Sequence, residues 1–522
     1  MSLDLNRAAP ARPRLSHLAR TSLLIGFFFA IDKGLGLFRQ VVIGRQFGVS
    51  ADLDAFNVAN NLPDLLFAMI SGGALAIAFI PVLSESLERE GRQAAWDLFS
   101  RVANLAFLVT GLAAVVIAIF AGPLVRAELG VAPGFTPELQ SLVADLMRLN
   151  LVATLLFSLS GLVIAGLQAN KHFLLPAVAP VVYDLGQIFG ALVLAPSQGL
   201  RLAGITLPAA GLGVHGLVYG VILGAGLHFA IQIPGLIRYR FHWAPRLGWN
   251  HPGVRKVMAM LGPRILTMGA FQLMFVVQDN LASRLDVGSV TALAYGWLIM
   301  QVPETLLATA LGTALLPTLS EQFAHGDDSA FQTTLARAAR LLLALTVPAA
   351  VVLMIPLGPL VQSAFGFDAR GTGLVVWAAR AYLLGLTGHS LLEVCARGFY
   401  ARHNARTPLL AALARTALFV ALAVVLFRTL GFVGIGLSNS LAFTLEAALL
   451  IVLLSRRFRL LPELIKPALR TGLGAASGGL VAFAVMRLLA ASPLAAGVLA
   501  VLAGVLATVP FLWPELRQAA RL

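Results

Sequence analysis

Long apolar runs recur along this 522-residue chain, separated by short segments that carry charge, glycine or proline. The hydrocarbon core of a bilayer is about 30 Å thick and requires about 20 apolar residues per helical span. Only 12% of the residues are charged, whereas soluble domains have about 25%, so a soluble globular protein is excluded. The sequence therefore predicts an all-α integral membrane protein with about fourteen transmembrane helices. The predicted spans lie near residues 17–38, 55–80, 98–122, 143–167, 175–195, 208–236, 256–283, 290–316, 332–356, 376–396, 408–427, 431–454, 467–489 and 494–514.

The basic residues indicate how the spans are oriented rather than a nucleic-acid ligand, although the formal charge is +14. Lys and Arg beside short loops are retained on the cytoplasmic side of a membrane. With the N-terminus inside, 25 basic residues fall on the cytoplasmic side and 8 on the opposite side, so we expect both termini in the cytoplasm. The basic stretch Met1–Arg20 resembles the start of a signal peptide, but no A-x-A cleavage site follows, and we predict a retained first span.

Two sequence echoes relate the first half of the chain to the second half. The sequence PVLSE at 81–85 returns as PTLSE at 317–321, 236 residues later. The sequence GLQANKHFLLP at 166–176 matches GFYARHNARTP at 398–408 in its glycine, alanine and proline, 232 residues later. Similar offsets between spans of the same direction predict a parallel duplication of a six-helix unit.

This duplication predicts two six-helix lobes that face each other across a central cavity. The predicted boundaries are 1–240 for the first lobe, 241–456 for the second lobe and 457–522 for a final helix pair. Rocking of two such lobes exposes the cavity alternately to either side of the membrane, which is a transport mechanism. Transport is therefore the predicted class of function.

Charged residues inside a span are costly, so those of the first span are candidate site residues. Lys33 and Arg39 flank Gly34 and Gly36, which we expect to loosen the helix and let both cations face one cavity. Such a pair would bind an anionic group such as a diphosphate, because Arg39 offers a planar fork and Lys33 a point charge. Alternatively, Lys33 pairs with Asp32 or Asp54 and Arg39 anchors the span at the membrane interface.

The start of the second span is unusually polar. Asp54 is a candidate to balance the basic pair, whereas Asp52 is better explained as a helix cap. Pro63 is expected to break the helix and free carbonyl groups that Asn60 or water satisfies. These groups predict a wet protein interior rather than contact with lipid.

The second lobe offers fewer candidate site residues. Pro263 is a predicted helix break, and Arg264 is either a second cation that faces the cleft or an anchor that reaches the cytoplasmic interface. Asp279 and Asn280 are candidates to support the cavity; Asp279 either binds a coupling cation or pairs with Arg284. Pro303 is a further predicted hinge. The remaining charges within or near spans are attributed to ion pairs or interface anchoring: Arg148, Asp184, Arg380, Glu393, Arg415 and Glu446.

Signatures of enzymes are absent from the sequence. No GxxxxGK[ST], GxSxG, HExxH or CxxC motif occurs, so neither ATP hydrolysis nor these catalytic centres are expected. The single cysteine, Cys395, and the histidines His215, His228 and His389 lack companions at ligand spacing, so we expect no metal site and no cofactor. Three rivals remain open, and one of them, a receptor or scaffold, predicts that charge-neutralising changes in the cleft are harmless. A cation-coupled drug exporter requires an acidic cavity, and a membrane-embedded polyprenyl-phosphate transferase requires an acidic or histidine cluster.

The sequence GLGLFRQVVIGRQFGVSADLDAFNVANNLPDLL, followed by SGGALAIAFIPVLSE, resembles the start of the MurJ/MviN lipid II flippases. These belong to the multidrug/oligosaccharidyl-lipid/polysaccharide exporter superfamily. The resemblance continues through GSVTALAYGWLIMQVPETLLATALGTALLPTLSEQFA and RGFYARHNARTP and covers nearly the whole chain. It implies fourteen helices, a location in the bacterial inner membrane, and a final helix pair that forms a groove for the lipid tail. The implied substrate is undecaprenyl-diphosphate-linked MurNAc-pentapeptide-GlcNAc, and the implied partners are cell-wall synthesis proteins.

By the same resemblance, Arg39 matches a cavity arginine of the family, Lys33 stands where many members have another arginine, and Asp54 matches a family aspartate. The chain also departs from the family pattern. Leu298 replaces a cavity arginine of the eighth helix, so we expect another cation, with Arg264 as the candidate, to compensate the diphosphate. The other departures are at Phe67-Ala68, where many members have basic residues, and at Gly72-Gly73, where many have a glutamate before the glycine. The sequence names no coupling ion, and export of another polyprenol-linked saccharide stays an alternative.

Overall fold

The computed structural model describes residues 17–71, 73–199, 201–202, 205–458, 460–489 and 492–519, and these form an almost entirely helical protein. The basic stretch before residue 17 and the departure at Gly72 lie outside the described residues. The first half contains α1 (His17–Phe47), α2 (Ala51–Ala59), α3 (Asn61–Leu66), the π-helical turn η1 (Phe67–Ser71), α4 (Gly73–Arg89), α5 (Arg92–Arg126), α6 (Pro137–Ala169), α7 (Leu174–Phe189), the π-helical turn η2 (Gly190–Leu194), a hairpin of β1 (Arg201–Leu202) and β2 (Ile205–Thr206), α8 (Val214–Ala230) and α9 (Ile233–Arg238).

The second half begins after a connector at residues 239–251 and ends in a helix pair. It contains α10 (Pro252–Ala282), α11 (Ser289–Glu304), the π-helical turn η3 (Thr305–Thr309), α12 (Ala310–Ala324), α13 (Asp328–Met354), α14 (Leu357–Phe365), α15 (Ala369–Leu383), α16 (Leu386–Ala401) and α17 (Arg406–Phe458), and then α18 (Leu460–Leu488) and α19 (Pro493–Ala519).

The all-helical class predicted from the apolar runs is confirmed, but the number of spans is not. Within the described residues, ten helices are long and apolar enough to cross a membrane. One of them, α17, contains the two predicted spans 408–427 and 431–454, joined at Gly431, where φ is 58°. The predicted spans near 17–38, 55–80 and 376–396 are not among the ten, so the count of fourteen stays a prediction.

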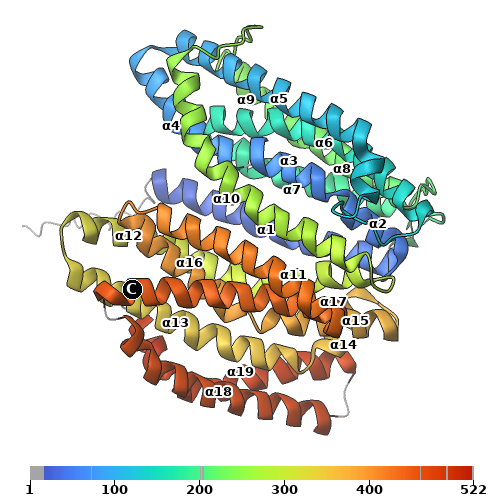
Figure 1. Ribbon diagram of the computed structural model, residues 1–522, viewed down its shortest axis with the longest axis vertical. Helices are drawn as coiled ribbons and strands as arrows, with labels where there is room; N and C mark the ends of the chain where they lie inside the picture. The colour runs from blue at the N-terminus through green and yellow to red at the C-terminus, as the bar shows by residue number, and fades with distance from the viewer. Residues whose placement is uncertain are drawn as a thin grey trace, which may run out of the picture.

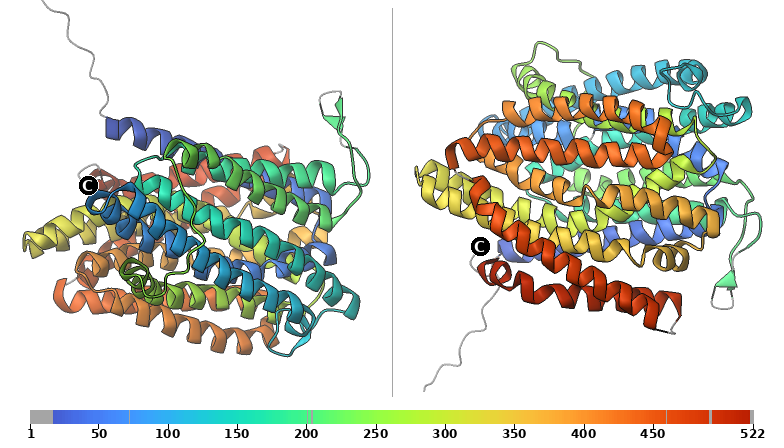
Figure 2. Two further views of the ribbon diagram at one scale, coloured as in Figure 1. Left: turned by 90° about the horizontal axis from the view of Figure 1, so that it is seen from above. Right: turned by 60° about the horizontal axis from the view of Figure 1, so that its bottom comes forward.

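Figure 1 shows the helices of the first half packed together above those of the second half, with α1 between them and α10 running diagonally from the first half to the second. Helix α10 contacts α3 and α4 of the first half as well as α17 of the second half. The pair α18 and α19 packs against α13 at the lower edge of Figure 1. The helices run roughly parallel to one another, so the loops gather at two opposite ends (Figure 2). We call the end with the connector 239–251 the linker end and the end with the β1–β2 hairpin the hairpin end.

The predicted duplication has counterparts in the backbone. In both halves a π-helical turn, η1 or η3, precedes a helix with an internal proline, Pro81 in α4 and Pro317 in α12. Lys171 and His403, which lie 232 residues apart, both have positive φ angles, 58° and 56°. Positive φ is uncommon for residues other than glycine, so its recurrence at equivalent positions supports the repeat.

The predicted helix breaks divide into two groups. Pro63 and Pro303 lie just before the π-helical turns η1 and η3, so helical regularity does change after each of them. The prediction of a break at Gly34 and Gly36 is wrong, because α1 is continuous from His17 to Phe47. Helix α10 likewise continues through Pro263. A glycine lowers helix propensity by about 1 kcal/mol relative to alanine but leaves the backbone hydrogen bonds intact, so it does not by itself end a long helix.

Helices α7 and α8 pack closely through glycines spaced four residues apart. A Cβ placed on Gly220 of α8 would lie 2.7 Å from the Cα of Gly190, and one on Gly224 would lie 2.5 Å from the carbonyl oxygen of Tyr183. Small residues at this spacing let membrane helices approach to backbone contact. This contact fixes α7, which carries two of the site residues described below.

We expect Gly220→Leu to separate these helices and lower the thermal stability of the purified protein. The added side chain overlaps backbone atoms, which have no alternative rotamer, and overpacking of this kind costs about 1 to 3 kcal/mol or more. Gly226→Leu is the matched control, because it lies in the same helix and a Cβ there has no atom within 4 Å. Equal melting temperatures of the two variants in detergent would contradict the assigned contact.

Candidate functional site

A polar cavity of about 460 Å³ lies among helices of the first half. Helices α1, α2, α3, α6, α7 and α8 all contribute to it, so residues more than 180 positions apart in sequence meet there. Its walls combine one cation, one carboxylate, several amides and a few aromatic rings. The lining residues are Arg39, Gln40, Phe56, Asn57, Asn60, Pro63, Asp64, Phe67, Asn150, Ala153, Thr154, Phe157, Tyr183, Gln187 and Val221.

Arg39 reaches this cavity from α1 and is already paired with a carboxylate. Its Nη1 donates to Oδ1 of Asp184 on α7 at 2.7 Å, and the two side chains are 19% and 6% exposed. The Nε of Arg39 is buried and has no hydrogen-bond partner among the described residues. Arg39 therefore lies where the sequence predicts a cavity cation. Its partner Asp184, attributed from the sequence only to an ion pair or to interface anchoring, is part of the site.

A second carboxylate, Asp64, faces the cavity without an ion pair among the described residues. It begins the turn of α3 that follows Pro63. The Nδ2 of Asn150 on α6 donates to Oδ1 of Asn60 at 2.7 Å. Within the part of the chain that the structure describes, the buried Oδ1 of Asn150 and the buried Nε2 of Gln187 have no hydrogen-bond partner. Such atoms require water or a polar ligand, so the cavity is a hydrated binding space.

Sequence reasoning placed Asn60 and Pro63 near the site but missed Asp64, Asn150 and Gln187. The usable signal was a set of amide and carboxylate side chains inside runs that are otherwise apolar. Each such residue is costly to bury in a membrane unless it faces protein or water.

Lys33 does not line this cavity. Its ammonium lies 3.3 Å from Asp32 and 5.1 Å from the centre of the Phe29 ring, and its side chain is 60% exposed. This is the pairing with Asp32 that the sequence analysis gave as the alternative. Lys33 and Arg39 therefore do not form a joint clamp in this structure.

Asp54 joins the two halves at the hairpin end instead of balancing a cation. Its carboxylate accepts hydrogen bonds from the backbone N–H groups of Gly288 and Thr291, at 2.6 and 2.7 Å, and from the Thr291 hydroxyl at 2.6 Å. The carboxylate thus sits at the N-terminus of α11, where the helix dipole favours negative charge. Gly288 adopts a φ of 94° there, a conformation that suits glycine.

The other predicted residues of α10 also hold the halves together. Asp279 accepts a hydrogen bond from Asn61 at 2.8 Å, and Asn280 donates to the carbonyl oxygens of Glu128 and Gly130. The predicted alternative in which Asp279 pairs with Arg284 is wrong, because Arg284 forms its ion pair with Glu128 instead, at 2.5 Å.

Arg264 lies in α10 away from the cavity in the first half. It is not a lining residue there, and its Nη1 is buried without a hydrogen-bond partner among the described residues. Next to it, Leu261 and Ile265 pack against the apolar cluster formed with α4 and α5. An unpartnered guanidinium nitrogen in such surroundings needs a polar ligand or water.

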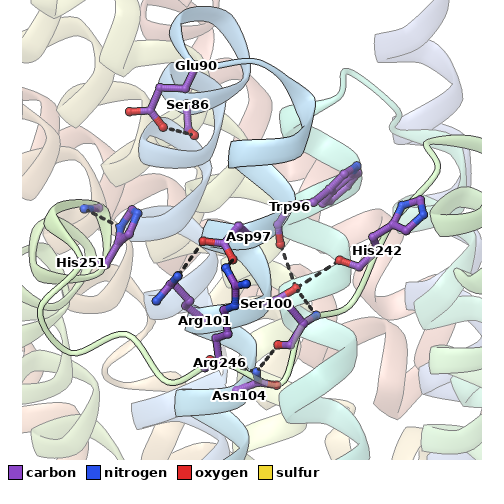
Figure 3. Close-up of polar contacts among 12 residues, drawn as sticks. Ser86, Glu90, Trp96, Asp97, Ser100, Arg101, Asn104, His242, Arg246 and His251 are labelled. Atoms are coloured by element: carbon purple, nitrogen blue, oxygen red, sulfur yellow. Dashed lines mark hydrogen bonds and ion pairs between the residues drawn. The ribbon is translucent and has the colours of Figure 1, made fainter.

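At the linker end, the connector 239–251 is bound along α5. Ser100 accepts a hydrogen bond from the backbone N–H of Ala244 at 3.2 Å, and Asn104 donates to the carbonyl oxygen of Ala244 at 2.7 Å. Asp97 forms ion pairs with Arg101 of α5 and with Arg246 of the connector, at 2.7 and 3.4 Å (Figure 3). The connector is therefore held on the first half before the chain enters α10.

A further ion pair bridges the halves beside the connector. Lys256 of α10 lies 2.5 Å from Glu85 of α4. The Lys256 ammonium holds the pKa of the Glu85 carboxyl below its ordinary value. Both ends of the molecule therefore contain polar contacts between the halves, more of them buried at the hairpin end.

Several other polar residues that the sequence singles out have structural partners. His228 contacts the Ser160 hydroxyl at 2.6 Å, and His389 stacks on Phe443, as expected for packing in the core. The predicted ion pairs are confirmed for Arg415 with Glu446, Arg148 with Asp145 and Glu393 with Arg397. Among the described residues, no group of three or more His, Cys, Asp or Glu side chains is placed to hold a metal ion.

In the described part of the chain, ten helices long and apolar enough to cross a membrane, in two halves that are joined at both ends and with a polar cavity in the first half, are the architecture of a multi-pass membrane transporter. The family model described as "Lipid II flippase MurJ" matches residues 43–514. This chain belongs to the MurJ family.

The relatives and structural neighbours agree with this assignment. The "Lipid II flippase MurJ" of Burkholderia cenocepacia is 31% identical over 84% of both chains. The "Probable lipid II flippase MurJ" of Vibrio cholerae is 27% identical, over 83% of this chain and 82% of the relative. A solved structure described as "Lipid II flippase MurJ, inward closed conformation" has the same fold, with a TM-score of 0.78 over 95% of this chain and 100% of that chain, at 21% identity. An inward-facing MATE family multidrug transporter of the MOP superfamily also shares the fold, with a TM-score of 0.68 over 82% of this chain and 96% of that chain, at 15% identity.

Proposed function

We propose that this protein is a flippase that moves lipid II, the undecaprenyl-diphosphate-linked precursor of peptidoglycan, from the inner to the outer leaflet of the bacterial inner membrane. The observation that carries the proposal is Arg39, a cation inside a polar cavity with an unpartnered buried Nε. Arginine is suited to this role because its planar donors match a phosphate in a two-point contact.

Arg39 would receive the diphosphate by exchanging partners. In this structure the guanidinium is neutralised by Asp184 at 2.7 Å. A diphosphate that approaches through the cavity replaces one anion by another, so the cation is never left buried and unpaired. The exchange leaves the buried Asp184 without its cation, so return of Asp184 to Arg39 favours release of the diphosphate.

We further propose that the linker end is cytoplasmic, since most of the basic residues gather there. Both termini then lie in the cytoplasm and the hairpin end faces the outer leaflet. The lobes are the segments 1–240 and 241–456, which rock about the contacts at either end. The pair 457–522 supports the polyprenyl tail, because α18 exposes Leu469, Leu473 and Leu480 at 68%, 64% and 71%.

Lys33, Arg264 and Asp54 keep secondary roles in this proposal. Lys33 meets the substrate at the cavity entrance if α1 moves, and Arg264 compensates the second phosphate when the halves separate on the linker side. Asp54 controls closure of the hairpin end through Gly288 and Thr291. Cell-wall synthesis proteins are the proposed partners, because they consume the lipid at the outer leaflet.

A leaflet-translocation assay in vesicles with purified protein and lipid II tests the role of Arg39. We expect Arg39→Ala to lower flux about 10- to 100-fold, the equivalent of one charge-assisted contact of about 1.5 to 3 kcal/mol. The charge-balanced double variant Arg39→Ala/Asp184→Ala should remain low, which separates loss of the cation from the cost of an unpaired Asp184.

Arg148→Ala is the matched control, since Arg148 forms an exposed pair with Asp145 away from the cavity. Lys33→Ala and Arg264→Ala measure how much each of these two cations contributes to flux. Flux equal to wild type in Arg39→Ala would refute the assigned site.

The departures from the family pattern favour a second candidate, export of another polyprenyl-diphosphate saccharide. Leu298 and Phe67 stand where many members have basic residues. Leu298 packs against the apolar core, and Phe67 lines the cavity. Fewer cations suit a headgroup with less negative charge than the lipid II pentapeptide. The same vesicle assay with a polyprenyl-diphosphate disaccharide that lacks the peptide distinguishes the two substrates.

A further inference from the structure

Asp64 is a carboxylate that lines the polar cavity of the first half and has no cationic partner among the described residues. We propose that the cavity of the first half binds a monovalent cation, Na⁺, through the carboxylate of Asp64 and the side-chain oxygen of Asn150. The role of this ion as the coupling ion rests on the proposed function; the binding site itself does not.

The charge balance of the cavity is the first argument. The charged side chains around it are Arg39, Asp184 and Asp64. Arg39 and Asp184 neutralise each other at 2.7 Å, which leaves the single negative charge of Asp64. The Asp64 side chain is exposed and lines the cavity, so a cation that enters the cavity can reach this uncompensated charge and lower the energy of this state.

The unpartnered atoms are the second argument, and they are independent of the first. Asn150 is 2% exposed, lines the cavity and has a buried Oδ1 with no hydrogen-bond partner among the described residues. Its orientation is fixed, because Nδ2 of the same amide donates to Oδ1 of Asn60 at 2.7 Å. The free atom is therefore an acceptor, which accepts a cation or a water but not another acceptor.

The type of ligand follows from these donors. Carboxylate, amide and water oxygens are hard ligands that suit hard cations, whereas softer transition metals prefer thiolate or imidazole ligands. One carboxylate balances a single charge, and no cluster of three or more His, Cys, Asp or Glu side chains is available in the described part of the chain. A volume of about 460 Å³ leaves room for waters that complete the shell of a small ion.

Occupancy of this site would couple to the exchange at Arg39. When a diphosphate takes Arg39 from Asp184, two carboxylates are left without a cation: Asp64 in the cavity wall and Asp184 behind Arg39. A bound Na⁺ offsets part of that charge, so cation and lipid diphosphate are expected to bind cooperatively.

Thermal unfolding of the purified full-length protein, without lipid substrate, tests the site. We expect NaCl, compared with choline chloride at equal ionic strength, to raise the melting temperature saturably by about 2 to 4 °C in the wild type. Asp64→Asn should remove this difference in melting temperature. Asn150→Ala should raise the Na⁺ concentration that gives half of the maximal increase about tenfold. Asp52→Asn is the matched control, because Asp52 is exposed at the start of α2 and does not line the cavity.

A local measurement accompanies the melting curves. The native Cys395 is buried, so a cysteine placed at Ala153 in the cavity wall reports on that cavity alone. Na⁺ should slow its reaction with a small thiol reagent, and this protection should vanish in Asp64→Asn. Equal labelling in NaCl and choline chloride, or protection that persists in Asp64→Asn, would overturn the proposal. Neither measurement involves flux, so failure of the proposed function leaves the result interpretable.

Discussion

Replacing Arg415 by methionine is expected to lower the free energy of unfolding by about 3 to 5 kcal/mol, because it leaves Glu446 as an unpaired buried carboxylate. The two residues lie on either side of the Gly431 kink in α17, and their side chains are only 7% and 3% exposed. The Nη1 of Arg415 lies 2.9 Å from Oε2 of Glu446, and the guanidinium also lies 4.3 Å from the centre of the Phe443 ring. No second cation is recorded beside Glu446 in the described residues.

The double variant Arg415→Met/Glu446→Leu should recover most of this loss. Removing both charges eliminates the cost of keeping a charge away from water, and apolar residues of similar volume often replace a buried ion pair without net loss. Thermal and denaturant unfolding in detergent measure all three proteins. The comparison isolates the unpaired carboxylate from the loss of packing around Phe443.

The exposed pair of Arg148 and Asp145 provides the matched control for Arg415. Its N–O distance is 2.7 Å, but the side chains are 44% and 54% exposed. Exposed pairs contribute about 0 to 1 kcal/mol, so Arg148→Met should change stability little. A loss in Arg148→Met as large as in Arg415→Met would show that burial does not decide the cost.

Most of the long helices were predictable because the local sequence alone, a long apolar run, determines them. A run such as 98–122 is apolar over its whole length, and only a helix satisfies the backbone of such a run within a bilayer. The repeat was also visible, because PVLSE at 81–85 and PTLSE at 317–321 keep the same proline in equivalent helices. The sequence predicted a single span near 55–80 and not the division into α2, α3, η1 and α4, since the π-helical turn η1 depends on packing with α6 and α10.

The candidate site was predictable only in part, because its chemistry depends on partners that are far apart in sequence. Arg39 was identified as a costly charge in a span, but its partner Asp184 lies 145 residues away. Asp54 was identified as a polar residue of the second span, but its role depends on Gly288 and Thr291, more than 230 positions later. Periodicity and composition contain no information on such pairings, which the packing of α1 on α7 and of α2 on α11 creates.

Replacing Asp54 by asparagine is expected to open the hairpin end. The carboxylate accepts three hydrogen bonds of 2.6 to 2.7 Å, one from Gly288 at Oδ2 and two from Thr291 at Oδ1. In asparagine an amide nitrogen replaces one of these oxygens and cannot accept the bonds made to it, and the remaining oxygen is no longer charged. Loss of contacts to a charged acceptor costs about 2 to 3 kcal/mol, which shifts the ratio of open to closed states about 30- to 150-fold. The shift favours opening because these contacts join the two halves.

A cysteine at Ala153 measures this opening, since Ala153 lines the cavity and the native Cys395 is buried. In reconstituted vesicles, we expect an impermeant thiol reagent added on the hairpin side to label this cysteine faster in Asp54→Asn than in the parent protein. Asp52→Asn is the matched control, because Asp52 lies in the same helix but is exposed. Other contacts at this end, such as Arg45 with the carbonyl oxygens of Ser363 and Ala364, remain in both variants and limit the opening to a shift in population. Equal labelling rates in the two aspartate variants would show that Asp54 is not what keeps the hairpin end closed.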